Sequence, residues 1–377
     1  MTESNQTITR RDRGFSVTAH SSLATLVRVT TTWSDRRPGI LACIAVTCAA
    51  SVLAACGSND EARQSVSRQT GCGVDALLIP RCGALWGIST PENRDLSATE
   101  QVVGRKFDMV YRFHDINATI PTQFERRLAN SGTILHYSID PRDYGNASST
   151  AIAWADIAAG DFDWSLRRQA EGIASLHRTV FVTFDHEADQ REKTARGSAA
   201  DFKAAWRHVH QVFEEAHARI VWVWVVIGYP ETFARAGMLW PGNRYVDWIS
   251  WDVYNTSGCR DGQIDPSKYR SFEDAMLPFY EWINSEGPGY GIDKHKPMMI
   301  SEAASAIYPG NPAMTARWYE QIPQTLRKYP RIKAVTLWSS VATCDYRVTN
   351  NPTVTTGVAE AGRSPIFDQL SGRVLSR

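Results

Sequence analysis

Val180-Phe181-Val182-Thr183-Phe184-Asp185-His186-Glu187 and Lys296-Pro297-Met298-Met299-Ile300-Ser301-Glu302 are two apolar runs that each end at a glutamate. Short runs of this composition predict buried strands. A carboxylate at the C-terminal end of a barrel strand is a typical catalytic position. The two glutamates lie far apart in the sequence. A fold that gathers distant strand ends is therefore needed to bring them together.

Eight runs of this kind recur, with helical or loop segments between them, as expected for a parallel sheet wrapped by helices. They are Ala84 to Ile88, Met109 to Phe113, Ile134 to Ile139, Val180 to Phe184, Ile220 to Ile227, Trp248 to Val253, Pro297 to Ser301 and Ala334 to Trp338. Apolar spacings of three and four predict helices such as Asp201 to Ala218 and Thr315 to Lys328. No internal repeat is visible, so we expect a single-domain (β/α)8 TIM barrel over residues 71–377.

The first 56 residues have the pattern of an export signal. Arg36 and Arg37 precede an uncharged apolar run, Gly39 to Ala55, which ends at Cys56. Leu53-Ala54-Ala55-Cys56 resembles a bacterial lipobox, in which the cysteine is acylated. A single membrane anchor is the alternative, but the run is short for a membrane span. We predict a lipoprotein signal over 1–56, a polar tether over 57–70, and an exported protein held by its lipid outside the bacterial cell membrane, or secreted.

Four of the seven cysteines, Cys72, Cys82, Cys259 and Cys344, lie beyond the predicted signal. An even number in an exported protein favours disulfides. Three pairings are possible, of which we prefer Cys72 with Cys82 and Cys259 with Cys344. Free thiols or a zinc site are the alternatives, but no pair has the close spacing of a zinc knuckle. The formal net charge of +1 does not suggest a nucleic-acid partner.

The ordered set of motifs resembles glycoside hydrolase family 26, a branch of the clan of (β/α)8 retaining glycosidases. His186-Glu187 is similar to the family's His-Glu pair after strand four. Tyr245 to Asn255 is similar to its strand-six motif, and Lys296 to Glu302 to its strand-seven motif. Ile332 to Trp338, followed by Asp345 to Val348, is similar to its strand-eight region. The resemblance runs through most of residues 84–350.

The resemblance implies a β-mannanase-like enzyme, an endo-1,4-β-mannosidase by default, with β-glucan or xylan as other possible polysaccharide substrates. Glu187 would be the general acid/base and Glu302 the nucleophile, in a mechanism that requires neither cofactor nor metal. His186 would orient the acid or the substrate. Tyr254 would donate a hydrogen bond to the nucleophile, and Trp338 would form the floor under the reacting sugar.

Positions at the ends of the first two strands supply weaker candidates for substrate binding. Trp86 follows strand one and His114 follows strand two, so both would line the cleft. Core packing is the alternative for each aromatic ring. We expect a monomer whose contact with the membrane is limited to the lipid anchor.

The segment after Glu187 departs from the family pattern. The family commonly has Asn-Gly and a tryptophan-rich stretch there, whereas this chain has the charged sequence Ala188 to Lys193. The change suggests a different sugar, a decorated polymer, or reduced activity. A non-hydrolytic glycan-binding protein of the cell envelope is therefore the alternative function. A transglycosylase that uses the same covalent intermediate is a third possibility.

Overall fold

A computed structural model describes residues 72–91, 93–143, 151–259, 266–368 and 370. The predicted signal, the tether and Cys56 lie outside these residues. Among the described helices, none is both long and apolar enough to cross a membrane.

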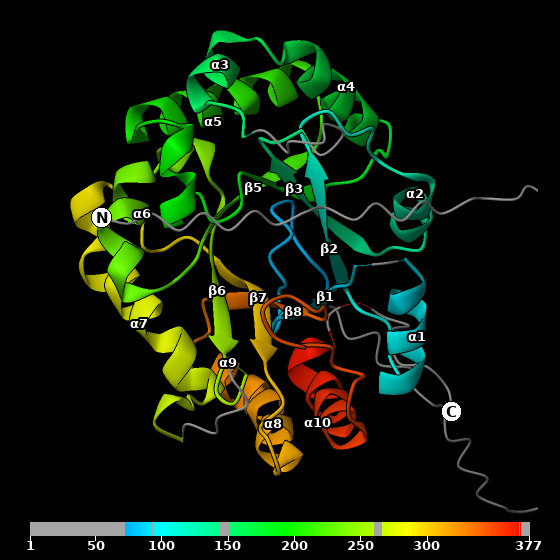
Figure 1. Ribbon diagram of the computed structural model, residues 1–377. Helices are drawn as coiled ribbons and strands as arrows, with labels where there is room; N and C mark the ends of the chain where they lie inside the picture. The colour runs from blue at the N-terminus through cyan, green and yellow to red at the C-terminus, as the bar shows by residue number, and fades with distance from the viewer. Residues whose placement is uncertain (1–71, 92, 144–150, 260–265, 369, 371–377) are drawn as a thin grey trace, which may run out of the picture. The chain divides into compact units, whose positions relative to one another are not determined.

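Eight parallel strands form a closed barrel in sequence order, and the first strand pairs with the last (Figure 1). The strands are β1 (Leu85–Ser89), β2 (Met109–Asp115), β3 (Ile134–Asp140), β4 (Val180–Phe184), β5 (Ile220–Val226), β6 (Trp248–Asn255), β7 (Met298–Ser305) and β8 (Ile332–Trp338). The predicted (β/α)8 barrel and all eight predicted strands are confirmed.

The helices pack around the outside of the strands (Figure 1). They are α1 (Asn93–Val103), α2 (Gln123–Asn130), α3 (Trp154–Ala159), α4 (Asp163–Ala174), α5 (Ala199–Glu215), α6 (Phe233–Leu239), α7 (Phe272–Ser285), α8 (Pro312–Glu320), α9 (Ile322–Lys328) and α10 (Pro352–Gly362). The predicted helix over 201–218 is α5, which begins at a capping box between Ser198 and Asp201. The single helix predicted over 315–328 is two helices. Pro323 explains the break, because it has no N–H to continue α8 and instead lies in the first turn of α9.

Alternate residues of each strand face two different cores. In β4, Phe181 points into the barrel, where it packs with Leu85 and Met109, whereas Val182 and Phe184 face the helices. Both faces of the strands are therefore buried, which explains why their sequences are almost continuously apolar.

The barrel interior changes from apolar to polar towards the C-terminal ends of the strands. Above Phe181, the side chain of Thr183 lies 2.8 Å from Nε2 of His136, and the imidazole of His136 stacks on Tyr111 with ring centroids 3.9 Å apart. Burial is the main cause of a pKa of His136 well below its usual value, so this ring is neutral. This polar layer leads directly to the candidate site.

Candidate active site

The segment that follows β4 carries Asp185, His186 and Glu187, of which the first and third have an uncommon backbone conformation. Asp185 and Glu187 have φ angles of 52° and 53°, in the left-handed region that few residues other than glycine adopt. A hydrogen bond of 3.1 Å from the N–H of Glu187 to the carbonyl of Val225 ties the segment to β5. Strained residues of this kind cluster at active sites, where the surrounding structure holds them in place.

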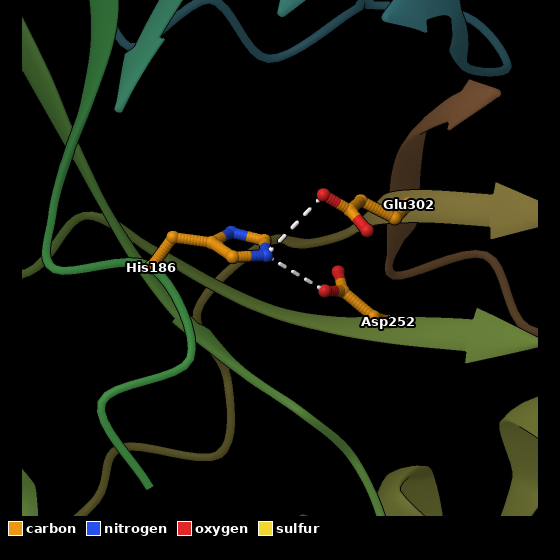
Figure 2. A group of neighbouring side chains, drawn as sticks. All are labelled: His186, Asp252 and Glu302. Atoms are coloured by element: carbon orange, nitrogen blue, oxygen red, sulfur yellow. Dashed lines mark ion pairs between the residues drawn. The ribbon is translucent and has the colours of Figure 1, made fainter. Parts of the chain in front are cut away.

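The imidazole of His186 lies between carboxylates from two neighbouring strands (Figure 2). Its Nε2 atom is 3.0 Å from Oδ2 of Asp252 on β6 and 3.3 Å from Oε1 of Glu302 on β7. Its other nitrogen, Nδ1, is 2.9 Å from the hydroxyl of Tyr111 on β2. The ring is therefore held from both sides, and Nε2 faces the acidic pair.

A register shift brings the two carboxylates together. Trp251 pairs with Ile300, but the next residue, Asp252, pairs with Glu302, so that Ser301 is skipped. Such bulges are common next to active sites because they re-aim side chains. Glu302 was predicted to follow its strand. It lies inside β7 instead, because the small residues Ala303 to Ser305 continue the pairing with β6.

Each glutamate has its own hydrogen-bond donor. The hydroxyl of Tyr254 donates to Oε2 of Glu302, and the side-chain amide of Gln190 donates to Oε2 of Glu187. The same oxygen of Glu187 lies 3.9 Å from Nε2 of His186. Both predicted catalytic carboxylates therefore lie within 4 Å of a single imidazole nitrogen, at the distances of 3.9 Å and 3.3 Å.

Burial raises the pKa values of all three clustered carboxyl groups. The pKa of Glu187 is well above its usual value because of burial and then the charge of Asp252. Burial and the charge of Glu302 do the same to the pKa of Asp252. Burial raises the pKa of Glu302 to about 7, although the charge of His186 and the hydrogen bond from Tyr254 oppose this rise. A protonated Glu187 beside a partly ionised Glu302 is thus favoured near neutral pH.

The charged segment after Glu187 turns inward. The ammonium group of Lys193 lies 2.8 Å from Oδ1 of Asp185 and also donates to the carbonyl of His186. Arg196 binds Asp185 and reaches Asp140 at 3.1 Å. Lys193 and Arg196 are both buried. They support the loop from beneath, and of the segment's side chains Gln190 is the one that touches a predicted catalytic group.

Two aromatic rings form a wall beside the cluster. Phe113, at the end of β2, meets the ring of His186 edge-on at 5.2 Å and that of Trp338 edge-on at 5.6 Å. With 36% of its surface exposed, Phe113 faces the open end of the barrel. Trp338, the last residue of β8, therefore lies beside the site.

Trp86 and His114 lie elsewhere, and their predicted place in the cleft is corrected. Trp86 is completely buried between β1 and the C-terminal segment, with its ring 4.6 Å from that of Phe367. His114 is ion-paired with Glu125 of α2, with Nε2 and Oε1 2.7 Å apart. The cause is strand alternation, which points both side chains outward to the helix layer.

Sequence reasoning missed three members of the site, Asp252, Tyr111 and Phe113. Asp252 was quoted within the strand-six motif, and a lone carboxylate in an otherwise apolar strand was the signal that could have identified it. Tyr111 and Phe113 lie on the same face of β2. The sequence alone does not say whether that face points into the barrel or towards the helices.

A pocket of about 330 Å³ opens beside Tyr254. Tyr229 and Glu231, after β5, and Thr256 and Arg270, after β6, contribute to its lining. Aromatic, carboxylate and hydroxyl groups of this kind can bind the apolar faces and hydroxyls of a sugar.

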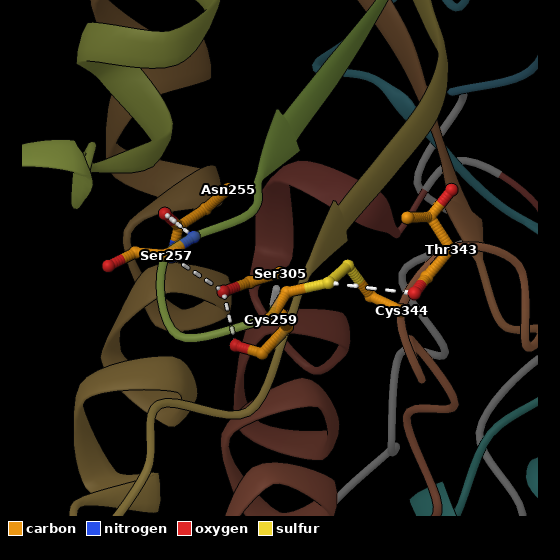
Figure 3. Close-up of a disulfide and its surroundings, with 7 residues drawn as sticks. Asn255, Ser257, Cys259, Ser305, Thr343 and Cys344 are labelled. Atoms are coloured by element: carbon orange, nitrogen blue, oxygen red, sulfur yellow. Dashed lines mark hydrogen bonds between the residues drawn. A yellow bond between two sulfur atoms is a disulfide. The ribbon is translucent and has the colours of Figure 1, made fainter. Parts of the chain in front are cut away.

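Both preferred disulfides, Cys72–Cys82 and Cys259–Cys344, are present. The second joins the loop after β6 to the loop after β8 (Figure 3). Cys259 and Cys344 pack in one cluster with Tyr346, Tyr254 and Trp338. The disulfide therefore supports the wall of the site that carries the latter two residues.

No family model matches the chain. The chain is 25% identical over 293 residues to Endoglucanase H of Acetivibrio thermocellus, a match that covers 73% of this chain and 30% of that protein. It is 22% identical over 156 residues to a β-1,3-xylanase of a Vibrio species, covering 41% of this chain and 29% of that protein. The chain thus spans about 30% of the length of the curated relatives it matches.

Solved structures of glycoside hydrolase family 26 enzymes share the fold. A β-mannanase of this family from Bacteroides ovatus gives a TM-score of 0.56 at 15% identity, covering 76% of this chain and 90% of that chain. A modular endo-β-1,4-mannanase from Cellulomonas fimi gives a TM-score of 0.56 at 13% identity, covering 78% and 74%. The barrel therefore has the fold of the family that the motifs resemble.

Proposed function

We propose that the protein is a retaining β-glycoside hydrolase that cleaves a β-linked polysaccharide, with Glu187 as general acid/base and Glu302 as nucleophile. The main support is the placement of both carboxylates within 4 Å of Nε2 of His186, at 3.9 Å and 3.3 Å. Retaining enzymes use a closely spaced pair of carboxyl groups, about 5 to 5.5 Å apart, of which one is protonated and the other ionised.

The reaction proceeds in two steps. Glu302 attacks the anomeric carbon while Glu187 donates its proton to the leaving oxygen, which gives a covalent glycosyl-enzyme. Glu187, now ionised, then accepts a proton from a water molecule that attacks the same carbon, and the sugar leaves with its configuration retained. Tyr254 stabilises the ionised form of Glu302, because a hydrogen bond to a carboxylate favours its charged state.

The surrounding residues orient the sugar. Trp338 and Phe113 form an aromatic wall beside the reacting centre. The pocket next to Tyr254 offers Tyr229 and Glu231 to a neighbouring sugar unit. An endo-acting enzyme on β-mannan is the default, since β-mannanases share the fold, and the match to a β-1,3-xylanase supports including xylan among the substrates tested.

The first experiment measures reducing-sugar release by the full chain from mannans, mixed-linkage β-glucans and β-1,3-xylans, with Glu302→Ala as the inactive control. Release by the native chain that the control lacks would identify the polymer. Proton NMR of the first product then reports its anomeric configuration. An inverted product would contradict the retaining mechanism. Binding to a polymer without release would favour the non-hydrolytic glycan-binding function.

We also propose that Cys56 is acylated after export, on the basis of its Leu53-Ala54-Ala55-Cys56 motif. The two disulfides fit an exported protein, because oxidising compartments maintain them. Labelling of the protein with a radioactive fatty acid in bacteria tests this proposal. Incorporation should disappear in Cys56→Ser, and a variant that still carries the label would place the lipid elsewhere.

A further inference from the structure

Three side chains of the site present one potential ligand atom each to a common point. The atoms belong to His186, Asp252 and Glu302 and lie within 4.8 Å of one another. Figure 2 shows the imidazole of His186 pointing at the two carboxylates, which come from the adjacent strands β6 and β7. The three residues stand on different elements, so the barrel itself fixes their relative positions.

Asp252 supplies an independent sign of a ligand. Only 2% of its surface is exposed, yet apart from the ion pair with His186 neither carboxylate oxygen has a hydrogen-bond partner of good geometry among the described residues. Buried polar groups nearly always have such partners, and an exception calls for an explanation such as an ion. Its Oδ2 atom lies 3.0 Å from Nε2 of His186 and faces the centre of the cluster.

The spacing of the three atoms suits a small transition-metal ion. Ligand atoms bound at about 2.0 to 2.1 Å from a tetrahedral zinc ion lie about 3.3 Å apart. Nε2 of His186 is 3.0 Å from Asp252 and 3.3 Å from Glu302. The Asp252 and Glu302 atoms lie within 4.8 Å of each other, so they would approach by at most about 1.5 Å to bind the ion.

The outer contacts also match those of metal ligands. A histidine ligand usually has its second ring nitrogen fixed by a hydrogen bond, and carboxylate ligands are hydrogen-bonded in turn. Here the hydroxyl of Tyr111 lies 2.9 Å from Nδ1 of His186, and Tyr254 donates to the second oxygen of Glu302. Both contacts leave Nε2 of His186 and Oε1 of Glu302 available to bind a metal ion.

We propose that His186, Asp252 and Glu302 reversibly bind one divalent transition-metal ion of the zinc or copper type, which excludes the sugar from the site. One imidazole and two carboxylates suit these ions. Calcium requires six to eight oxygen ligands and magnesium prefers oxygen ligands and water, so neither fits this set. The inhibitory role rests on the proposed glycosidase function, because the ion would occupy the nucleophile Glu302. Binding of the metal does not depend on that function.

Calorimetric titration of the full chain with Zn²⁺ tests the site directly. We expect one saturable event and a rise in melting temperature with added Zn²⁺, because a ligand that binds the folded state stabilises it. Mg²⁺ and Ca²⁺ should produce neither effect. Asp252→Asn should remove the event, and Tyr111→Phe should weaken it by about 10-fold, the usual effect of losing an outer-shell contact.

His208→Gln is the matched control variant. His208 of α5 forms a partly buried histidine–carboxylate pair with Asp163 of α4, outside the barrel, with Nε2 and Oδ1 2.6 Å apart. This change should leave the Zn²⁺ affinity unaltered. Absence of saturable binding in the native chain, or binding that Asp252→Asn retains in full, would overturn the proposal.

Kinetics on a hydrolysed glycan separate the two proposals. Zn²⁺ should raise the apparent KM without lowering kcat, as expected when metal and sugar compete. Inhibition that lowers kcat alone would overturn the competitive arrangement. Zn²⁺ binding lost in Asp252→Asn, in a chain that cleaves none of the polymers, would support the metal site while contradicting the hydrolase function.

Discussion

Asp185 and Glu187 are two carboxyl groups separated by one residue, and their environments shift their pKa values in opposite directions. Both follow β4, both have left-handed backbones and both side chains are largely buried. Burial alone would raise the pKa of Asp185, but the charges of Lys193 and Arg196 outweigh it and hold the pKa below its usual value. Glu187 has a weaker counter-charge, His186, whose Nε2 lies 3.9 Å away, and burial together with Asp252 outweighs it and raises the pKa of Glu187.

The comparison shows that counter-charges, rather than burial, distinguish the ionised carboxylate of Asp185 from the carboxyl group of Glu187, which we propose as the acid/base. Asp185 receives Lys193, Arg196 and a 2.8 Å hydrogen bond from the indole N–H of Trp154. These contacts satisfy both carboxylate oxygens of Asp185 and anchor the loop. Glu187 accepts a hydrogen bond from Gln190 and lies 3.9 Å from Nε2 of His186, but burial and the charge of Asp252 favour its protonated form.

Loss of either proposed catalytic carboxylate should have the largest effect on activity. Glu302→Ala should lower kcat on the polymer by about 10⁴-fold or more, because no covalent intermediate can form. Glu187→Ala should be similarly impaired on the polymer but should retain turnover of an aryl glycoside whose leaving group needs no proton. Equal losses by both variants on the aryl glycoside would refute the assignment of roles. Glu192→Ala, which removes an exposed glutamate of the same loop, is the control.

Asp185→Asn should lower the free energy of unfolding. It leaves the buried charges of Lys193 and Arg196 without their carboxylate, and removal of one partner from a buried ion pair typically costs about 3 to 5 kcal/mol. Glu187→Gln should cause no such loss, because it removes an acid whose ionisation is disfavoured. Urea denaturation of both variants measures the difference. Equal free energies of unfolding would remove the distinction between the two carboxylates.

The pH profile tests the state of the nucleophile. Since the pKa of Glu302 is about 7, kcat/KM should fall as the pH drops below about 7 and the nucleophile becomes protonated. Tyr254→Phe removes a hydrogen bond to the ionised form, so the acidic limb should move upward by about one pH unit. An acidic limb near pH 4 in the native chain would contradict a raised pKa for Glu302.

Asp252→Asn should have the smallest effect. It should raise the stability of the folded state slightly, and the gain should depend on pH. The pKa of Asp252 is higher in the folded state than in the unfolded state. Its contribution to the free energy of unfolding is therefore fully present below the unfolded-state pKa and is lost as the pH rises through the folded-state pKa. The variant should therefore melt a few degrees above the native chain at pH 8, corresponding to about 1 kcal/mol, and show little gain at pH 4. Asp161→Asn, an exposed carboxylate, is the control. A difference in melting temperature that is the same at pH 4 and pH 8 would contradict a raised pKa for Asp252 as its cause.

The sequence predicted the fold well because strands buried on both faces produce long apolar runs. It also indicated Glu187 and Glu302, since each closes such a run. It did not reveal which way His114 and Trp86 face, because both faces of these strands are covered, and the helix layer can bury an indole such as Trp86 or pair an imidazole with a carboxylate, as Glu125 does for His114.

Other features depend on structure that one sequence does not carry. The place of Asp252 beside Glu302 results from a register shift that no local pattern marks. The charges after Glu187 suggested an altered cleft, but Lys193 and Arg196 bind Asp185 below it.

The bond between Cys259 and Cys344 makes completion of the site dependent on the cell compartment. Asn255, at the end of β6, binds Ser305 of β7 at 3.0 Å, and the disulfide then extends this connection to the segment after β8 (Figure 3). In a reducing cytosol the two loops would remain separate polypeptide segments. Oxidation would therefore act as a maturation step, and the wall that carries Tyr254 and Trp338 would be completed only in an oxidising compartment.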